Sequence, residues 1–131
     1  MSNKLDKILA EISAGELFDK ITILEIKKEK ISNNEKLVDV EKELNSLNDT
    51  VGKFIPDQSN ISKYIDDLKE INLKLWDIED GKRAAEKEKK FDDKFIELAR
   101  NVYKLNDERA KIKLAINMAL GSNIKEVKSY E

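Results

Sequence analysis

The residues best suited to binding chemistry are polar side chains that recur at helical spacing inside two long heptad patterns. The patterns cover residues 61–86 and 95–120, and the middle of each seam is polar where a stable coiled coil is apolar. The six polar residues at or beside the seam are Asn72, Glu79, Arg83, Asn106, Arg109 and Lys113. Guanidinium forks and lysine ammonium groups bind carboxylates and phosphates. The set therefore predicts a site for an anionic ligand.

The elements that must position these side chains are two helices folded back on each other. A short link around residues 89–91 favours antiparallel pairing of the helices on either side of it. The expected register pairs Asn72 with Arg109, Leu75 with Asn106, and Glu79 with Val102. The polar residues of both helices then lie within about two turns of one another.

Residues 15–31 predict a central helix, because apolar side chains spread round most of its circumference. A capping box is expected at its start, in which the Ser13 hydroxyl accepts from the Glu16 amide and the Glu16 carboxylate reaches back. Glu25 projects on the apolar side of this helix, where a carboxylate is unexpected. We therefore add Glu25 to the candidate site as a contribution from the first helix.

The rest of the chain predicts three further helices. The second follows a capping pattern at residues 32–35 and ends near Gly52, and a loop around Pro56 comes after it. The third and fourth are expected from about Ile61 to Lys89 and from about Asp92 to Leu120, the last stopped by Gly121.

The expected fold is an all-α antiparallel bundle of about four helices in a single domain, 1–131, whose last two helices are long and form a helical hairpin. Residues 1–12 have helical spacing but could equally run extended. The tail, 122–131, shows no sustained period and either packs back as a strap or stays loose.

Composition narrows the classes of function. The 25 basic and 27 acidic residues are interleaved, so no basic face for nucleic acid is expected. Cysteine and histidine are both absent, which removes disulfides, thiolate metal sites and the usual general base. No apolar run has the length of a membrane span or a signal core, so we expect a cytoplasmic protein. We expect no cofactor and no metal, since the acids of residues 77–80 point in different directions on a helix.

Three long strings carry a family resemblance: GELFDKITILEIK at residues 15–27, LWDIED at 75–80 and FIELARNVYKLNDERAKIK at 95–113. They resemble an uncharacterised family of small helical bacterial and phage proteins, domain of unknown function 6165, and the terminal KSY at 128–130 is also similar. Members are similar to segments beside or fused to glycosyltransferases in surface-polysaccharide gene neighbourhoods. The resemblance implies an accessory role in glycan biosynthesis, with a glycosyltransferase as partner.

Our first functional hypothesis is a small non-catalytic binding or accessory protein that holds an anionic small molecule in the polar seam. It rests on a charge count in which Arg83, Arg109 and Lys113 outnumber Glu25 and Glu79. Desolvating such an excess is costly unless an anion arrives.

Other hypotheses fit the same residues. One is a small helical enzyme acting on an anionic metabolite such as a sugar nucleotide, phosphate or carboxylate, with catalytic residues not identified. Another is a helical oligomerisation module, in which the chain forms a homo-oligomer. The polar residues could instead form a buried network that sets the helix register, or lie hydrated at the solvent-facing end of a longer helix pair.

Overall fold

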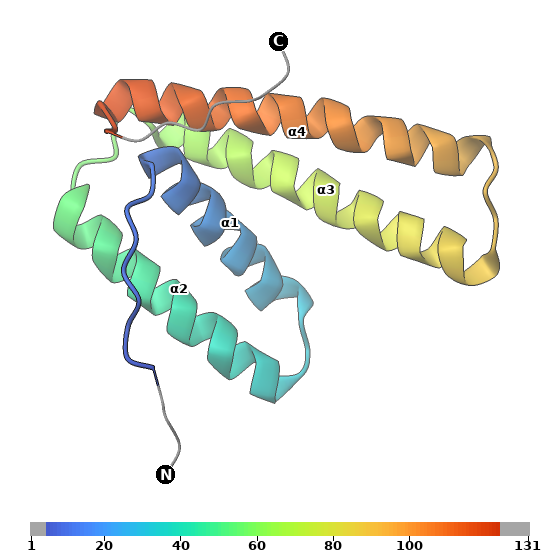
Figure 1. Cartoon of the computed structure of the whole chain (residues 1–131), viewed down its shortest axis with the longest axis horizontal. Coiled ribbons are helices and arrows are strands. Elements are labelled where there is room, and N and C mark those ends of the chain that lie inside the picture. The colour runs from blue at the N-terminus through green and yellow to red at the C-terminus, as the bar shows by residue number, and fades with distance from the viewer. Residues whose placement is uncertain (1–4, 124–131) are drawn as a thin grey trace.

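Four α-helices make up the regular structure of this computed structural model, which describes residues 5–123. They are α1 (Ala14–Lys30), α2 (Asn34–Phe54), α3 (Ser62–Glu88) and α4 (Asp93–Leu120). α3 and α4 form a long antiparallel hairpin, and α1 and α2 form a shorter pair beneath one end of it (Figure 1). The predicted all-α bundle of about four helices is confirmed, including the hairpin of its last two helices.

α1 is the central helix, as its apolar circumference predicts. It packs against the other three helices, whereas α2 contacts α1 alone among the helices. The core joins α1 to each of the other helices. Its buried members include Leu17, Phe18, Ile21 and Leu24 of α1, Val40, Leu44 and Val51 of α2, Leu68 of α3 and Ile116 of α4. Each such side chain contributes roughly 1.5–3 kcal/mol through burial, so this end of the molecule holds the fold together.

One of the two hydrogen bonds of the predicted capping box is present at the start of α1. The Ser13 hydroxyl accepts a hydrogen bond from the Glu16 amide at 3.0 Å. The Glu16 carboxylate, however, turns to Lys113 of α4 at 2.8 Å instead of reaching back to the first turn. A charged partner on another helix has replaced the second half of the capping box.

α2 differs slightly from the prediction at both ends. Its cap is Asn33, one residue after the expected Ser32, and the Asn33 side chain accepts from the Lys36 amide at 3.0 Å. The helix then continues past Gly52 to Phe54, because a single glycine near a helix end costs only about 1 kcal/mol.

The hairpin helices end in left-handed residues. α4 stops at Gly121 with φ 64°, as predicted, whereas α3 stops at Lys89 with φ 54°, a conformation that favours glycine. At its start α3 has no side-chain cap, because its capping position is the fully buried Ile61. The polar loop residues before Ile61 therefore do not cap α3 through a side chain.

The chain before α1 is extended. Residues 5–12 are exposed and form no helix, which settles the described part of the ambiguous segment. The predicted tail lies outside the described residues from 124 onward; Ser122, which is described, accepts from the Ala14 amide at 3.2 Å. None of the helices in the described range is both long and apolar enough to cross a lipid bilayer.

Candidate functional site

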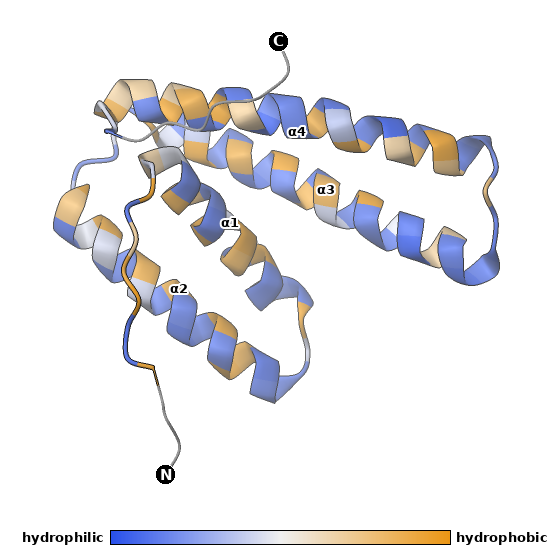
Figure 2. Ribbon diagram, viewed as in Figure 1, coloured by the Kyte–Doolittle hydropathy of each residue, from blue (hydrophilic) through white to orange (hydrophobic). Residues whose placement is uncertain are grey.

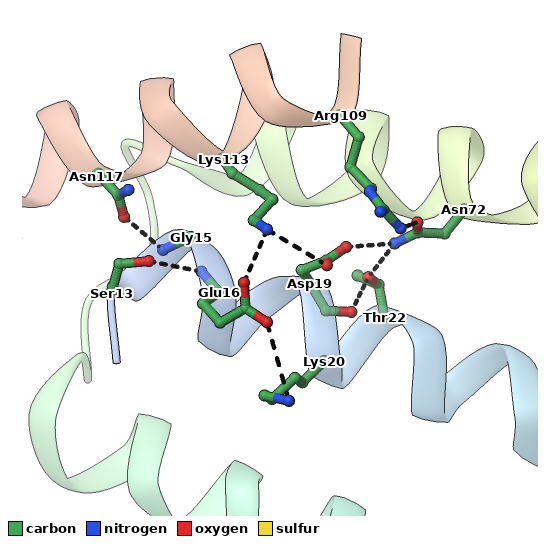
Figure 3. Close-up of polar contacts among 10 residues, drawn as sticks. All are labelled: Ser13, Gly15, Glu16, Asp19, Lys20, Thr22, Asn72, Arg109, Lys113 and Asn117. Atoms are coloured by element: carbon green, nitrogen blue, oxygen red, sulfur yellow. Dashed lines mark hydrogen bonds and ion pairs between the residues drawn. The ribbon is translucent and has the colours of Figure 1, made fainter. Parts of the chain in front are cut away.

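α1 carries a buried polar stripe on the face that it turns to the hairpin. Gly15, Asp19 and Thr22 are spaced four and three apart, so they lie on one side of the helix. All three are buried. This stripe lies against the polar seam of α3 and α4, and the two together form an inner network of Glu16, Asp19, Thr22, Asn72, Lys113 and Asn117 (Figure 3).

Lys113 is the buried cation of this network. The residue is only 7% exposed, and its Nζ lies 2.8 Å from Glu16 Oε2 and 3.7 Å from Asp19 Oδ2. Figure 3 shows it reaching from α4 to the carboxylates of Glu16 and Asp19 on α1. Because a buried ammonium is tolerated only with such partners, Lys113 joins α1 to α4 rather than facing an open site.

α1 and α4 approach each other most closely at Gly15. The Gly15 amide donates to Asn117 Oδ1 at 2.6 Å, and Asn117 is fully buried. A Cβ on Gly15 would collide with the carbonyl oxygen of Lys113, so this approach requires glycine. The bond also satisfies one of the amides that the first turn of every helix leaves without a partner.

Asn72 of α3 is oriented by α1. The Thr22 hydroxyl donates its proton to the Asp19 backbone carbonyl at 2.9 Å, so Thr22 Oγ1 can still accept a hydrogen bond. Asn72 Nδ2 donates to Thr22 Oγ1 at 3.0 Å and to Asp19 Oδ1 at 2.9 Å. Its amide can satisfy both acceptors only with the nitrogen turned toward α1, so Oδ1 faces the other way, toward Arg109.

Arg109 is a charged group beside the network that has no charged partner within 4.0 Å among the described residues. Its guanidinium, on a half-buried residue of α4, donates to Asn72 Oδ1 at 3.4 Å. Within the described chain no carboxylate lies within 4.0 Å of it. A guanidinium has five N–H donors in a planar fork, so one long bond to a neutral oxygen leaves most of its binding capacity unused.

A depression of about 260 Å³ opens beside Arg109 and Asn72, in the angle between α1 and the hairpin. It is lined by Ile23 of α1, by Asn72, Leu75, Trp76, Glu79, Asp80 and Arg83 of α3, and by Arg109 of α4. The lining of the depression therefore combines two aliphatic side chains and an indole with charged groups of both signs. Such a mixture of apolar walls with a few polar groups is typical of small-molecule sites.

The structure brings together four of the seven residues that the sequence nominated. Asn72, Glu79, Arg83 and Arg109 line the depression, and the Arg109–Asn72 hydrogen bond agrees with the predicted register. Lys113 belongs to the inner network. Asn106 and Glu25 are half-buried, and neither lines the depression.

The charge count needs a correction. It set three cations against two acids and omitted Glu16 and Asp19, which neutralise Lys113. What remains in the depression is Arg83 and Arg109 facing Glu79 and Asp80, so its charges balance formally. An anionic ligand is therefore favoured by the unused N–H donors of the Arg109 guanidinium, and not by an overall excess of positive charge.

Sequence reasoning missed Asp19, Thr22 and Asn117. The signal was present for the first two, because they follow Gly15 at intervals of four and three and interrupt an apolar helix. Glu25 attracted attention instead, although it lies to one side of that stripe. Among the described residues, no group of three or more carboxylate, thiol or imidazole side chains is arranged to hold a metal ion.

Comparison with known proteins places the chain in a family. No curated protein matches it, and no solved structure does either. The model of a family of unknown function, DUF6165, matches residues 8–131, which is nearly the whole chain and confirms the resemblance carried by the three strings. The chain therefore belongs to this family of unknown function, DUF6165.

Proposed function

We propose that this protein is a small non-catalytic binding protein that takes an anionic ligand in the depression beside Arg109. The observation that supports this function is the state of the Arg109 guanidinium. It is half-buried, meets one neutral acceptor at 3.4 Å and has no carboxylate within 4.0 Å in the described residues. A carboxylate or phosphate would supply the bidentate partner that the fork lacks.

The inner network supports this role by fixing the position of the site. Asn72 holds Arg109, and Asp19 and Thr22 hold Asn72, each through bonds between buried or half-buried groups. A guanidinium that is positioned before the ligand arrives loses less side-chain freedom on binding. The network is therefore a scaffold, and the depression next to it is the binding surface.

Binding is better supported than catalysis. The chain has neither histidine nor cysteine. The Glu79 carboxylate in the depression lies 3.5 Å from the Lys82 ammonium on the exposed surface. Turnover of a phosphorylated or carboxylated metabolite that disappears in Glu79→Gln would favour the enzyme instead.

The site contains its own reporter. Trp76 is the single tryptophan of the chain and lines the depression, so its fluorescence reports on this place alone. We expect a saturable change when inorganic phosphate is added. Arg109→Gln should weaken that binding about tenfold or more, because a charge-assisted hydrogen bond contributes roughly 1.5–3 kcal/mol.

The matched control is Arg100→Gln, which removes the same charge from an exposed position of α4 and should leave the titration unchanged. Circular dichroism of each variant separates a lost ligand from a lost fold. Identical titrations for the parent protein and folded Arg109→Gln, or no saturable response at all, would overturn the proposal.

The family resemblance supports a biological setting for this activity, an accessory role beside a glycosyltransferase in surface-polysaccharide synthesis. The oligomerisation hypothesis remains a separate prediction. Size-exclusion chromatography with light scattering checks it, and a strict monomer would count against it.

A further inference from the structure

The charges of the depression are ordered along α3. Arg109 lies level with Asn72 at one end, Trp76 follows one turn later, and the Glu79 and Asp80 carboxylates come after a second turn. Counted from Arg109, the order is therefore cation, aromatic face and anion, with the exposed cation Arg83 one turn beyond the acids. From this order, and resting on the proposed function, we infer that the ligand is a zwitterion, namely a phosphorylated amino alcohol whose phosphate binds Arg109 and whose ammonium group lies against Trp76 near the two carboxylates.

The acidic end favours a positive group on the ligand. Ionised carboxylates only accept hydrogen bonds. Glu79 has the Lys82 ammonium at 3.5 Å on the exposed surface, and Asp80 has no cation within 4.0 Å in the described part of the chain. Arg83, one turn further on, also approaches neither carboxylate within that distance. Glu79 and Asp80 lie between Arg109 and the exposed Arg83 and would repel a phosphate placed beside them, so the anion is assigned to the half-buried Arg109.

The wall between the two ends suits an alkylated or primary ammonium group. The face of an indole attracts cations, and Ile23 and Leu75 provide apolar surface for methylene or methyl groups. A depression of about 260 Å³ accommodates phosphocholine or phosphoethanolamine as a whole, whereas pockets for drug-sized ligands start at about 300 Å³.

Trp76 fluorescence tests the inference with four soluble probes: phosphocholine, phosphoethanolamine, inorganic phosphate and choline. We expect the two zwitterions to bind about tenfold more tightly than inorganic phosphate. The double variant Glu79→Gln/Asp80→Asn should remove this advantage and leave phosphate binding in place, while Arg109→Gln should weaken both. Asp77→Asn, an exposed acid of α3 outside the depression, is the control and should change neither.

The two sources of this chemistry, a free metabolite and a lipid headgroup, are separated by co-sedimentation with vesicles of phosphatidylcholine or phosphatidylethanolamine. Binding to the soluble probes alone assigns the free metabolite, and co-sedimentation that Arg109→Gln abolishes assigns the headgroup; both support the inference. Equal affinity for phosphate and phosphocholine would overturn the zwitterion and leave the anion site standing. Absence of binding by phosphate and by both zwitterions would remove the site itself.

Discussion

At the residue scale, Lys113 shows how the chain uses a buried charge to join two helices. Its two carboxylate partners, Glu16 and Asp19, come from adjacent positions on one face of α1. Such a group adds little net stability compared with a well-packed apolar residue, but its removal leaves the partners without their counter-charge. The bonds therefore select the relative placement of α1 and α4 more than they strengthen the fold.

Lys113→Met should consequently destabilise the protein by about 3 kcal/mol, the lower end of the cost of breaking a buried ion pair. Urea denaturation at neutral pH measures the change in the free energy of unfolding. The control is Lys111→Met, which removes an exposed lysine from the same helix and should change stability by less than about 0.5 kcal/mol. Equal effects of the two substitutions would contradict the role given to Lys113.

Two glycines offer a second residue-scale test. Gly15→Ala forces a methyl group against the Lys113 carbonyl and should cost about 1–3 kcal/mol or more, the range for overpacking. Gly52→Ala meets no atom within 4 Å and should be neutral or stabilise α2 by up to about 1 kcal/mol. Thermal denaturation of both variants measures the effect of the same added methyl group at a tightly packed helix contact, Gly15, and at a position with open space, Gly52.

The candidate site could be predicted in part from single residues. The heptad seam pointed to Asn72 and Arg109 because a polar group at such a position is conspicuous. Asp19 was overlooked because helix α1 is apolar nearly all round, and a sequence does not say which side meets the hairpin. That choice depends on the crossing of α1 over α3 and α4, which packing decides.

At the element scale, helix positions were predictable and helix ends less so. Periodicity placed all four helices, because their apolar stripes must face a core. The start of α3 has no side-chain cap, since Ile61 takes that position for its burial and not for its hydrogen-bonding ability. Local capping chemistry contributes about 1 kcal/mol, and the burial of a large aliphatic side chain outweighs it.

The turn between α3 and α4 provides an element-scale prediction. Lys89 adopts φ 54°, where a side chain is strained by roughly 1–2 kcal/mol. Lys89→Gly should therefore stabilise the protein by about 0.5–1 kcal/mol after the greater freedom of glycine in the unfolded chain is subtracted. Gly121→Ala, at the equivalent turn after α4, should do the opposite, and chemical denaturation of both variants checks the pair.

At the scale of the whole molecule, the hairpin divides into a supported and an unsupported half. No residue from Leu73 to Ile112 is buried. In Figure 1 this distal part extends beyond α1 and α2, and Figure 2 shows hydrophilic residues over most of the distal part of α3. Two helices without a third layer bury little apolar surface, so local stability should fall toward the turn.

Hydrogen exchange measures this gradient directly. Amides near Leu68 and Ile116, both fully buried, should exchange at least about tenfold more slowly than amides around the α3–α4 turn. Peptides from α2, which has exposed faces but a buried stripe, serve as an intermediate reference. Uniform protection along the hairpin would contradict the expected gradient and would favour the oligomerisation hypothesis, because a second copy could then cover the distal half.

The contacts between α1 and α4 also constrain when the chain can fold. Three hydrogen bonds from the first turn of α1 to residues 113–122 join residues that are 97, 102 and 108 positions apart in the sequence. During synthesis α1 leaves the ribosome well before α4 exists, so Asp19 and Thr22 must stay hydrated in the meantime. The inner network and the depression beside it are consequently among the last features to form, because both need α4 in place.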